Sequence, residues 1–299
     1  MIAGPPASEP VPDTSRIIAF QGAPGAYSDL ACRTARPELA TLPCRSFDDA
    51  FAALRDGAAG LAMIPIENSV AGRVADIHHL LPDSGLHIIG EHYQRVNHHL
   101  LALPGSRIGE ITHVHSHIHA LNQCRRLIRE LGLEPVVRID TAGAAGEIAA
   151  AGDRTQAVIA SELAGAIYGL ESLRANIEDQ AHNTTRFLIM AREALLPHPK
   201  ASPCMTSFVF RVRNVPAALY KALGGFATNS VNLTKLESYL IGGGFDAAQF
   251  YAEVEGHPEH RGLRLALEEL DFFSREVRIL GVYPQHPFRW QNGKTEEAD

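Results

Sequence analysis

Short apolar segments alternate with alanine-rich segments of helical character along most of the chain, and this rhythm limits the fold more than any other feature. Residues 17–20 and 61–64 have strand character, and helical stretches follow them from about Ser28 and Asn68. A third strand at residues 113–115 precedes a helical stretch at residues 120–131. Strands that alternate with helices pack as an α/β fold, so we predict sheets whose strands are largely parallel.

A proline-rich segment interrupts this rhythm at about residues 191–202, and we predict a domain linker there. Beyond it we expect, in order, a strand, a helix, two strands, a helix and a strand, at residues 206–212, 216–227, 231–240, 250–254, 259–271 and 277–282. This βαββαβ order predicts a ferredoxin-like sandwich. The predicted domains therefore span residues 16–193 and 205–284. We expect residues 1–15 and 291–299 to be disordered.

The composition argues against several classes of partner. The 299 residues carry a formal net charge of −7 and contain no basic stripe, so no nucleic acid is expected. No apolar run approaches the roughly 20 residues of a spanning helix, so no membrane is expected. The four cysteines lie far apart and form no Cys-x-x-Cys pair, which favours a reducing cytoplasm.

Neither a cofactor nor a metal ion is expected. The glycines at residues 22–25 lack the Gly-x-Gly-x-x-Gly pattern of a dinucleotide site. Four histidines alternate at His113, His115, His117 and His119, but no nearby acid or cysteine completes a zinc set.

Three polar motifs, at residues 22–28, 65–69 and 183–187, lie at or beside the ends of predicted strands. In the last of them, Asn183-Thr184-Thr185-Arg186-Phe187, a hydroxyl stands beside a fixed cation. Arg186 can bind a carboxylate through two parallel hydrogen bonds, and Thr185 can donate a proton or a hydrogen bond. The pairing predicts a site for a small anionic substrate.

In this order, and with Ser116-His117 and residues 140–145 before the last of them, these motifs resemble the prephenate dehydratase family. The resemblance covers residues 17–282. It implies an α/β, two-lobed catalytic domain like that of the periplasmic binding proteins, with a cleft between the lobes. It also implies that the C-terminal βαββαβ segment is a ferredoxin-like ACT domain, which senses amino acids.

The resemblance implies a reaction in which prephenate loses carbon dioxide and water to give phenylpyruvate in phenylalanine biosynthesis. It places Thr185 where a hydroxyl assists the departure of water; the alternative is that Thr185 caps an element or bonds a buried carbonyl. Because a leaving carboxylate is helped by weak solvation, we expect Arg186 to anchor the substrate's side chain or set the site's net charge. Glu67 is expected to bond the departing hydroxyl or to hold Arg186.

Further substrate contacts are expected from residues in the matching motifs: Tyr27, Ser28, Asn68, Ser69, Gly72, Ser116, His117, Thr141, Ala142 and Phe187. Two of these motifs have structural alternatives. Asn68 or Ser69 would cap a helix at residues 70–80, and Thr141 would lie in a capped helix that continues through residues 142–151.

The resemblance assigns phenylalanine binding and feedback inhibition to residues of the C-terminal segment: Ala218, Leu219, Asn232, Leu233, Thr234, Glu237 and Ser238. ACT domains pair, so a homodimer or homotetramer is implied. Two departures concern this site, because Tyr239-Leu240 replaces the frequent Arg-Pro and Ala218 replaces a glycine. The alternative is a purely structural dimerisation domain.

Two other functions compete with this prediction. Arogenate dehydratase acts on a substrate that carries an amine in place of the keto group of prephenate. A non-catalytic, two-lobed amino-acid-binding regulator belongs to a different class. The joint presence of Thr185, Arg186, Glu67 and Asn68 favours a catalyst.

Overall fold

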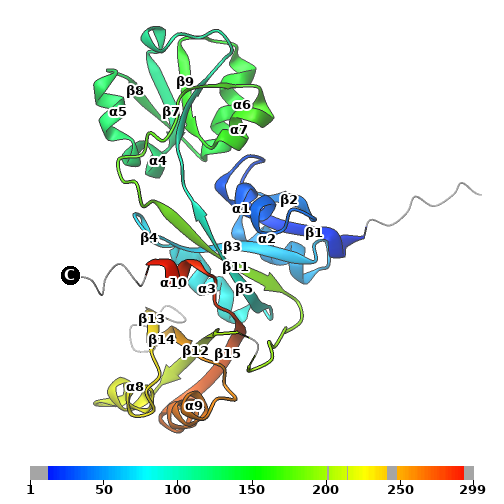
Figure 1. Cartoon of the computed structure of the whole chain (residues 1–299), viewed down its shortest axis with the longest axis vertical. Coiled ribbons are helices and arrows are strands. Elements are labelled where there is room, and N and C mark those ends of the chain that lie inside the picture. Colours follow the sequence, from blue (N-terminus) through cyan, green and yellow to red (C-terminus); the bar gives the residue numbers. More distant parts are fainter. Residues whose placement is uncertain (1–12, 201, 214, 241–247, 293–299) are drawn as a thin grey trace, which may run out of the picture.

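The protein consists of three sheets that follow one another along its long axis (Figure 1). The computed structural model describes residues 13–200, 202–213, 215–240 and 248–292. We call the middle sheet and its helices lobe 1, the sheet that contains β7 and β9 and its helices lobe 2, and the sheet of β12 to β15 with its helices the C-terminal domain. The chain crosses from lobe 1 to lobe 2 at residues 96–98 and returns at residues 175–183.

Lobe 1 is a six-stranded sheet of order β2-β1-β3-β11-β5, with β4 paired to β3. Its strands are β1 (Ile17–Gln21), β2 (Ala40–Cys44), β3 (Leu61–Asn68), β4 (Gly72–Arg73), β5 (His87–Arg95) and β11 (Thr184–Ala191). Its helices are α1 (Tyr27–Ala35), α2 (Phe47–Arg55) and α3 (Ala75–Asp83), and a 3-10 turn, η1 (Thr14–Arg16), precedes β1.

Lobe 2 is a five-stranded sheet of order β10-β6-β9-β7-β8. Its strands are β6 (His99–Ala102), β7 (His113–His117), β8 (Glu134–Arg138), β9 (Gln156–Ala160) and β10 (Glu171–Arg174). Its helices are α4 (Ile118–Gln123), α5 (Arg125–Glu130), α6 (Thr141–Ala151) and α7 (Glu162–Tyr168), with a 3-10 turn, η2 (Ile108–Glu110).

Both lobes are mixed sheets, which corrects the prediction of largely parallel ones. In lobe 1, β11 runs antiparallel to β3 and to β5. In lobe 2, β6 runs antiparallel to β9 and to β10. The reason is topological: the chain leaves lobe 1 at the end of β5 and re-enters it at the same end along β11, where Thr184 pairs with Arg95, so the two strands must run in opposite directions. No local pattern encodes this return.

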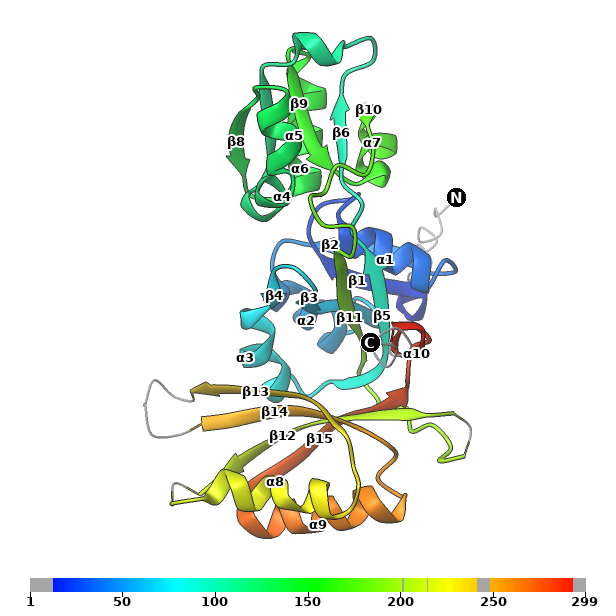
Figure 2. The same ribbon diagram turned by 60° about the vertical axis from the view of Figure 1, so that its left-hand side comes forward.

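The C-terminal domain has the predicted βαββαβ order and a four-stranded sheet of order β13-β14-β12-β15. Its elements are β12 (Cys204–Val212), α8 (Ala218–Thr228), β13 (Leu233–Leu240), β14 (Ala248–Glu255), α9 (Arg261–Phe273) and β15 (Ser274–Pro284), followed by α10 (Phe288–Asn292). Helices α8 and α9 cover one face of the sheet, and the other face packs against lobe 1 (Figure 2).

Three local predictions are corrected. The expected helix at residues 120–131 is two helices, α4 and α5, separated at Cys124. The expected helix at residues 70–80 begins only at Ala75, after β4, and no side chain caps it. Within the ends expected to be disordered, residues 14–15 belong to η1 and residues 291–292 to α10, while residues 1–12 and 293–299 lie outside the described residues.

Lobe 1 and the C-terminal domain share one hydrophobic core. Ile64, Ile77 and Leu188 of lobe 1 belong to the same cluster as Val209 and Tyr251 of the C-terminal sheet. The backbones also approach closely, since a Cβ atom at Gly281 of β15 would lie 2.1 Å from the carbonyl oxygen of Ile88 in β5. The two parts are therefore packed as one unit at this boundary.

Replacing Gly281 with alanine is expected to destabilise the protein by about 1–3 kcal/mol, because the added methyl group must push β15 away from the β5 backbone. Urea denaturation would measure the change. Gly224→Ala in α8 is the control: its Cβ would meet nothing within 4 Å, so the helix should gain about 0.5–1 kcal/mol. Equal effects of the two substitutions would contradict the close packing.

His78 of α3 makes the same boundary sensitive to pH. His78 is 3% exposed, its ring contacts Tyr251, and neither ring nitrogen has a hydrogen-bond partner among the residues that the structure describes. Burial, assisted by the charge of Lys235, lowers the pKa of His78 to about 4. The unfolded chain, with a histidine pKa near 6.5, therefore binds more protons between about pH 6.5 and 4.

Stability is consequently expected to fall as the pH drops through this window, by up to about 3 kcal/mol from His78 alone. Urea denaturation at about pH 7 and pH 4 would measure it, and His78→Leu should remove that share of the loss. His79→Leu is the matched control, because His79 is the exposed neighbour. An identical pH dependence in wild type and His78→Leu would refute the assignment.

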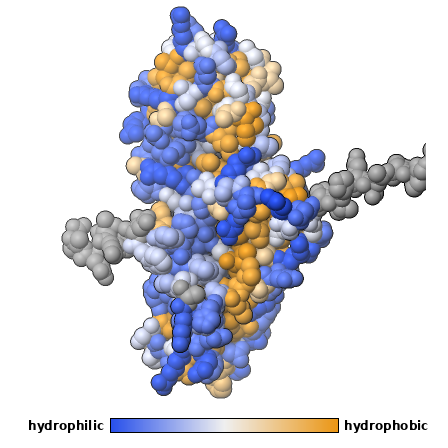
Figure 3. All heavy atoms as spheres, turned by 45° about the vertical axis from the view of Figure 1, so that its right-hand side comes forward, coloured by the Kyte–Doolittle hydropathy of each residue, from blue (hydrophilic) through white to orange (hydrophobic). Residues whose placement is uncertain are grey.

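The surface is largely hydrophilic on the face shown in Figure 3, with hydrophobic patches between the polar residues.

Among the helices that the structure describes, none combines the length and the apolar character needed to cross a membrane.

Candidate active site

The register of two neighbouring strands divides the predicted catalytic residues between two faces of the lobe 1 sheet. Thr185 of β11 pairs with Asn68 of β3, and Arg186 pairs with Glu67. Because successive side chains of a strand point to opposite faces, the Thr185–Asn68 pair and the Arg186–Glu67 pair lie on opposite sides of the sheet. The expectation that Thr185 and Arg186 act together on one substrate is therefore corrected.

On the first face, amide side chains hold Thr185. The Asn68 amide nitrogen donates to the Thr185 hydroxyl oxygen at 2.9 Å and to Asn183 Oδ1 at 2.8 Å. Asn183 Nδ2 in turn donates to Gln123 Oε1 of lobe 2 at 2.8 Å. Within the part of the chain that the structure describes, the hydroxyl proton of Thr185 has no protein acceptor, so it is available to a ligand.

The same network reaches the loop after β1. His98 Nε2 lies 3.0 Å from Gln123 Oε1, which makes this nitrogen the donor and leaves Nδ1 as an acceptor. The Tyr27 hydroxyl lies 2.9 Å from His98 Nδ1 and 2.7 Å from the carbonyl oxygen of Asn97. Burial raises the pKa of Tyr27 and lowers that of His98, so both are neutral near pH 7. Neutral groups thus link Tyr27 to Thr185 across both lobes.

Ser69 and Asn68 form hydrogen bonds where the chain returns from lobe 2 to lobe 1. The Ser69 hydroxyl donates to the His182 carbonyl at 2.9 Å and accepts from the Thr184 amide at 3.0 Å. Asn68 Oδ1 accepts from the amides of residues 70 and 71, and Gly72 pairs with Asn68 in β4 at a φ of 83°. Both side chains therefore stabilise a turn, and the alternative that they cap a helix is wrong.

Of the substrate residues predicted in lobe 2, two are enclosed by protein. Ser116 is fully buried and donates to the Ile159 carbonyl at 2.6 Å, and Ala142 is fully buried in the core. His117 caps α4, and Thr141 begins α6, which Asp140 caps. The predicted capped helix is thus confirmed, while Ser116 and Ala142 do not face a ligand in this arrangement.

Two predicted contacts in lobe 1 are also enclosed. Phe187 is 1% exposed in the core beneath α1, and Ser28 is buried in the first turn of α1. Gly25 in the same loop permits a close approach of the backbones, because a Cβ atom there would lie 2.7 Å from Ala164 Cα in lobe 2. The lobes touch here, where the Ser161 hydroxyl donates to the Gly25 carbonyl at 2.5 Å.

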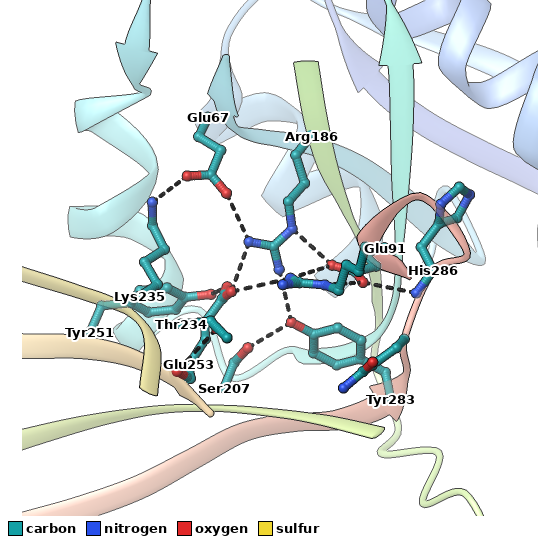
Figure 4. A network of polar contacts seen from close by, with 12 residues as sticks. Glu67, Glu91, Arg186, Ser207, Thr234, Lys235, Tyr251, Glu253, Tyr283 and His286 are labelled. Carbon is teal, nitrogen blue, oxygen red and sulfur yellow. Dashed lines mark hydrogen bonds and ion pairs between the residues drawn. The ribbon is translucent and has the colours of Figure 1, made fainter. Parts of the chain in front are cut away.

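On the opposite face, Arg186 is a buried structural cation. Its side chain is 4% exposed, and Nε donates to Glu91 at 2.8 Å while Nη1 donates to Glu67 at 2.9 Å (Figure 4). Glu253 Oε2 lies 2.7 Å from Nη1 without hydrogen-bond geometry, so this contact is an ion pair. Nη2 donates to the Tyr283 hydroxyl at 3.2 Å. Protein groups bind all three guanidinium nitrogens of Arg186, which corrects the prediction that Arg186 anchors the substrate.

Glu67 lies in the same ion cluster and does not approach Thr185. Its second oxygen is 2.5 Å from Lys235 Nζ of the C-terminal domain. Burial alone would raise the pKa of Glu67, but Arg186 and Lys235 outweigh it and hold that pKa below its usual value. The carboxylate is ionised near pH 7, so the expectation that it holds Arg186 is the one that fits.

Two pockets adjoin these strands. The larger, about 440 Å³, lies on the Arg186 face and is lined by Glu67, Asn68, Ser69, Tyr93, Arg95, His182, Thr184, Arg186 and Phe288. The smaller, about 240 Å³, is lined by Val70, Asn122, Gln123, Arg125, Glu178, Asp179, Gln180 and Asn183. The smaller pocket borders the amide network that holds Thr185.

The predicted effector residues lie on two elements of the C-terminal domain. Ala218 and Leu219 begin α8, whereas Leu233, Thr234, Glu237 and Ser238 lie on β13, and Asn232 precedes that strand. Glu237 faces lobe 1, where it meets Arg73 at 3.1 Å.

A family model described as prephenate dehydratase matches residues 18–195, which include both lobes and the Thr185 network. The chain belongs to the prephenate dehydratase family. Its C-terminal residues 204–284 lie beyond that match.

Relatives and solved structures extend the comparison to the C-terminal domain. A protein of Komagataeibacter europaeus named bifunctional N-acyl-homoserine lactone acylase/prephenate dehydratase is 56% identical over 92% of this chain and 98% of its own. Arogenate dehydratase/prephenate dehydratase 1 of Arabidopsis thaliana is 39% identical over 91% of this chain and 73% of its own. The prephenate dehydratase of Arthrobacter aurescens, solved with L-Phe, is 27% identical with a TM-score of 0.82 and covers 94% of this chain and 98% of its own.

Several residues of the network around Thr185 are not predicted by the sequence motifs. Asn183 lies inside the motif at residues 183–187, but only the structure shows that it accepts from Asn68 and donates to Gln123. Gln123 and His98 lie outside the motifs, and only the packing of α4 against the returning segment brings them to Thr185.

Proposed function

We propose that this protein is a prephenate dehydratase that converts prephenate into phenylpyruvate, carbon dioxide and water. One observation carries the proposal: Asn68 donates to the Thr185 hydroxyl oxygen and leaves the hydroxyl proton free beside the interlobe network. A hydroxyl group leaves as water only if a proton or a strong hydrogen bond reaches its oxygen. Thr185 supplies that donor, and Asn68 holds it in place.

The neutral character of the network supports the other step of the reaction, the loss of carbon dioxide. The hydrogen-bonded network that reaches Thr185 consists of neutral side chains, while Arg186, the next residue of β11, faces the other way. A carboxylate that is weakly solvated loses carbon dioxide more readily than one clamped by a guanidinium. The departing carboxylate would therefore lie against amides rather than against Arg186.

We further propose that the C-terminal segment is an ACT domain through which phenylalanine inhibits the enzyme. Its βαββαβ topology and the L-Phe complex of the Arthrobacter aurescens relative support this. Exposed Leu236 and Leu240 on the edge strand β13 suit pairing with a second copy, as a homodimer or homotetramer. The four cysteines are free thiols, which fits a cytoplasmic enzyme.

Arogenate is the alternative substrate, because several curated relatives are named for both activities. The experiment is to measure phenylpyruvate from prephenate and phenylalanine from arogenate with the purified protein, with and without added phenylalanine. Faster turnover of prephenate that phenylalanine inhibits supports the proposal. Preference for arogenate moves the assignment to that substrate, and absence of both reactions refutes a dehydratase.

A second activity, hydrolysis of N-acyl-homoserine lactones, is favoured by the 56% identity with the bifunctional relative. The larger pocket has an aromatic wall suited to an acyl chain, where Tyr93 and Phe288 stack at 4.5 Å. Its Ser69 hydroxyl bonds the backbone, and among the described residues no histidine ring activates this serine. Release of homoserine lactone by the same preparation would test this activity.

A further inference from the structure

A buried cluster of charges joins the catalytic lobe to the C-terminal domain (Figure 4). The cations are Arg186, Lys235 and Arg289, and the carboxylates are Glu67, Glu91 and Glu253. Burial of charge is costly unless each ion has a partner of opposite sign. The cluster therefore constrains the relative position of every strand that contributes to it.

The C-terminal domain contributes two of the contacts that hold lobe 1. Lys235 of β13, with a side chain 11% exposed, lies 2.5 Å from Glu67 Oε2. Glu253 of β14, with a side chain 1% exposed, lies 2.7 Å from Arg186 Nη1. Tyr251 donates to the other oxygen of Glu253, and the Ser207 and Tyr283 hydroxyls, 2.8 Å apart, complete the wall below Arg186.

The residues that these contacts hold are the strand neighbours of the proposed catalytic pair. Glu67 precedes Asn68 in β3, and Arg186 follows Thr185 in β11. The distance between neighbouring Cα atoms is fixed at about 3.8 Å. A shift of Glu67 therefore moves Asn68, and a shift of Arg186 moves Thr185. A register irregularity between Arg186 and Phe187 separates this end of β11 from the regular pairing beyond it.

We propose that Lys235 and Glu253 are positioning residues of the dehydratase, which fix Asn68 and Thr185 from the opposite face of the sheet by holding Glu67 and Arg186. This inference rests on the proposed function of Thr185. It makes the C-terminal domain part of the catalytic machinery, in addition to its role as a sensor.

The position of Lys235 gives the same contacts a second consequence. Lys235 lies on β13 between Thr234 and Glu237, two of the proposed effector residues, and its Nζ is 3.6 Å from Glu237. An effector that displaces β13 would pull Lys235 from Glu67, and the displacement would reach Asn68 one residue further along β3.

The test compares Lys235→Met with Arg211→Met, which removes a cation of the same domain that pairs with Glu276 at 3.3 Å and, within the described residues, forms no ion pair or hydrogen bond with lobe 1. Steady-state turnover of prephenate gives kcat and KM. Hydrogen–deuterium exchange of a peptide covering residues 184–191 reports the order of β11 independently of activity. The same measurements on Lys235→Met combined with Thr185→Ala show whether Lys235 acts through Thr185.

We expect Lys235→Met to lower kcat about tenfold, since small displacements of catalytic groups have such effects, with KM changed less than about twofold. Exchange at residues 184–191 should rise, and Arg211→Met should change neither quantity. In the Thr185→Ala background, Lys235→Met should cause no further loss, because its target is already absent.

Unchanged kcat and unchanged exchange in Lys235→Met would overturn the proposal, and so would losses that multiply in the double variant. If the wild type converts neither prephenate nor arogenate, the dehydratase assignment itself fails. The exchange measurement then still decides whether Lys235 orders β11, so the two failures are distinguishable.

Discussion

Replacing Thr185 with alanine is expected to lower kcat for prephenate by about 10²- to 10⁴-fold, the usual contribution of a positioned proton donor. The hydroxyl oxygen accepts from Asn68 at 2.9 Å, so its proton does not point at Asn68. Under the proposed function, this proton is donated to the leaving hydroxyl of the substrate. KM should change little, because the lost interaction strengthens only as the C–O bond breaks. Phenylpyruvate formation followed by its absorbance measures both constants.

Two matched variants accompany this measurement. Thr185→Ser keeps the hydroxyl and should retain most of the activity, whereas Thr184→Ala removes a hydroxyl on the opposite face of β11 and should leave dehydration nearly unchanged. Loss of the Asn68 hydrogen bond should cost only about 1 kcal/mol of stability. A Thr185→Ala enzyme that keeps more than a tenth of wild-type kcat would remove Thr185 from the mechanism.

Replacing Arg186 with methionine is expected to destabilise the fold by about 3–5 kcal/mol, the usual cost of removing one partner from buried ion pairs. The side chain contacts Glu67, Glu91 and Glu253, and the last two have side chains that are 0% and 1% exposed. Methionine fills much of the same volume but removes the positive charge that balances the negative charges of these carboxylates. Urea denaturation of wild type and variant measures the difference.

Arg174→Met is the control for this substitution. Arg174 also pairs with a glutamate at 2.8 Å, but its side chain is 46% exposed, and an exposed pair contributes only about 0–1 kcal/mol. The deficit of Arg186→Met should also shrink as the pH falls, because buried carboxylates without a partner have a raised pKa and take up protons in the folded state. Equal destabilisation by both substitutions would show that the buried ion pairs of Arg186 contribute no more to the free energy of unfolding than an exposed pair.

The family could be predicted from local motifs because the resemblance depends on short segments, and the same motifs lead to the hypothesis that Thr185 is the catalytic hydroxyl. Thr185 and Asn68 were singled out because hydroxyl and amide residues lay at the ends of predicted strands, and the register brings these two into contact. Arg186 was assigned to the substrate because a neighbouring cation suggests a shared site. The alternation of strand side chains places it on the other face, where acids far apart in the sequence enclose it.

The remaining site residues could not be predicted because their partners are distant in sequence. Gln123 meets Asn183 only because the chain re-enters lobe 1 beside α4. Lys235 meets Glu67 across a domain boundary, and neither residue lies in a pattern that indicates an ion pair. Ser116 was assigned by resemblance, but its burial and its bond to the Ile159 carbonyl depend on how β7 packs against β9.

By itself, the sequence determined the class of each part: strands alternating with helices in the lobes, the βαββαβ order after the proline-rich segment, and a hydroxyl–amide site at strand ends. These follow from periodicity, turn residues and short motifs, which act over a few residues. Only the tertiary structure decided the direction of β11, the division of Thr185 and Arg186 between two faces, and the union of lobe 1 with the C-terminal sheet through Gly281 and the buried charges. The reason is that charge compensation and close packing depend on which distant segments meet, and no local pattern records that choice.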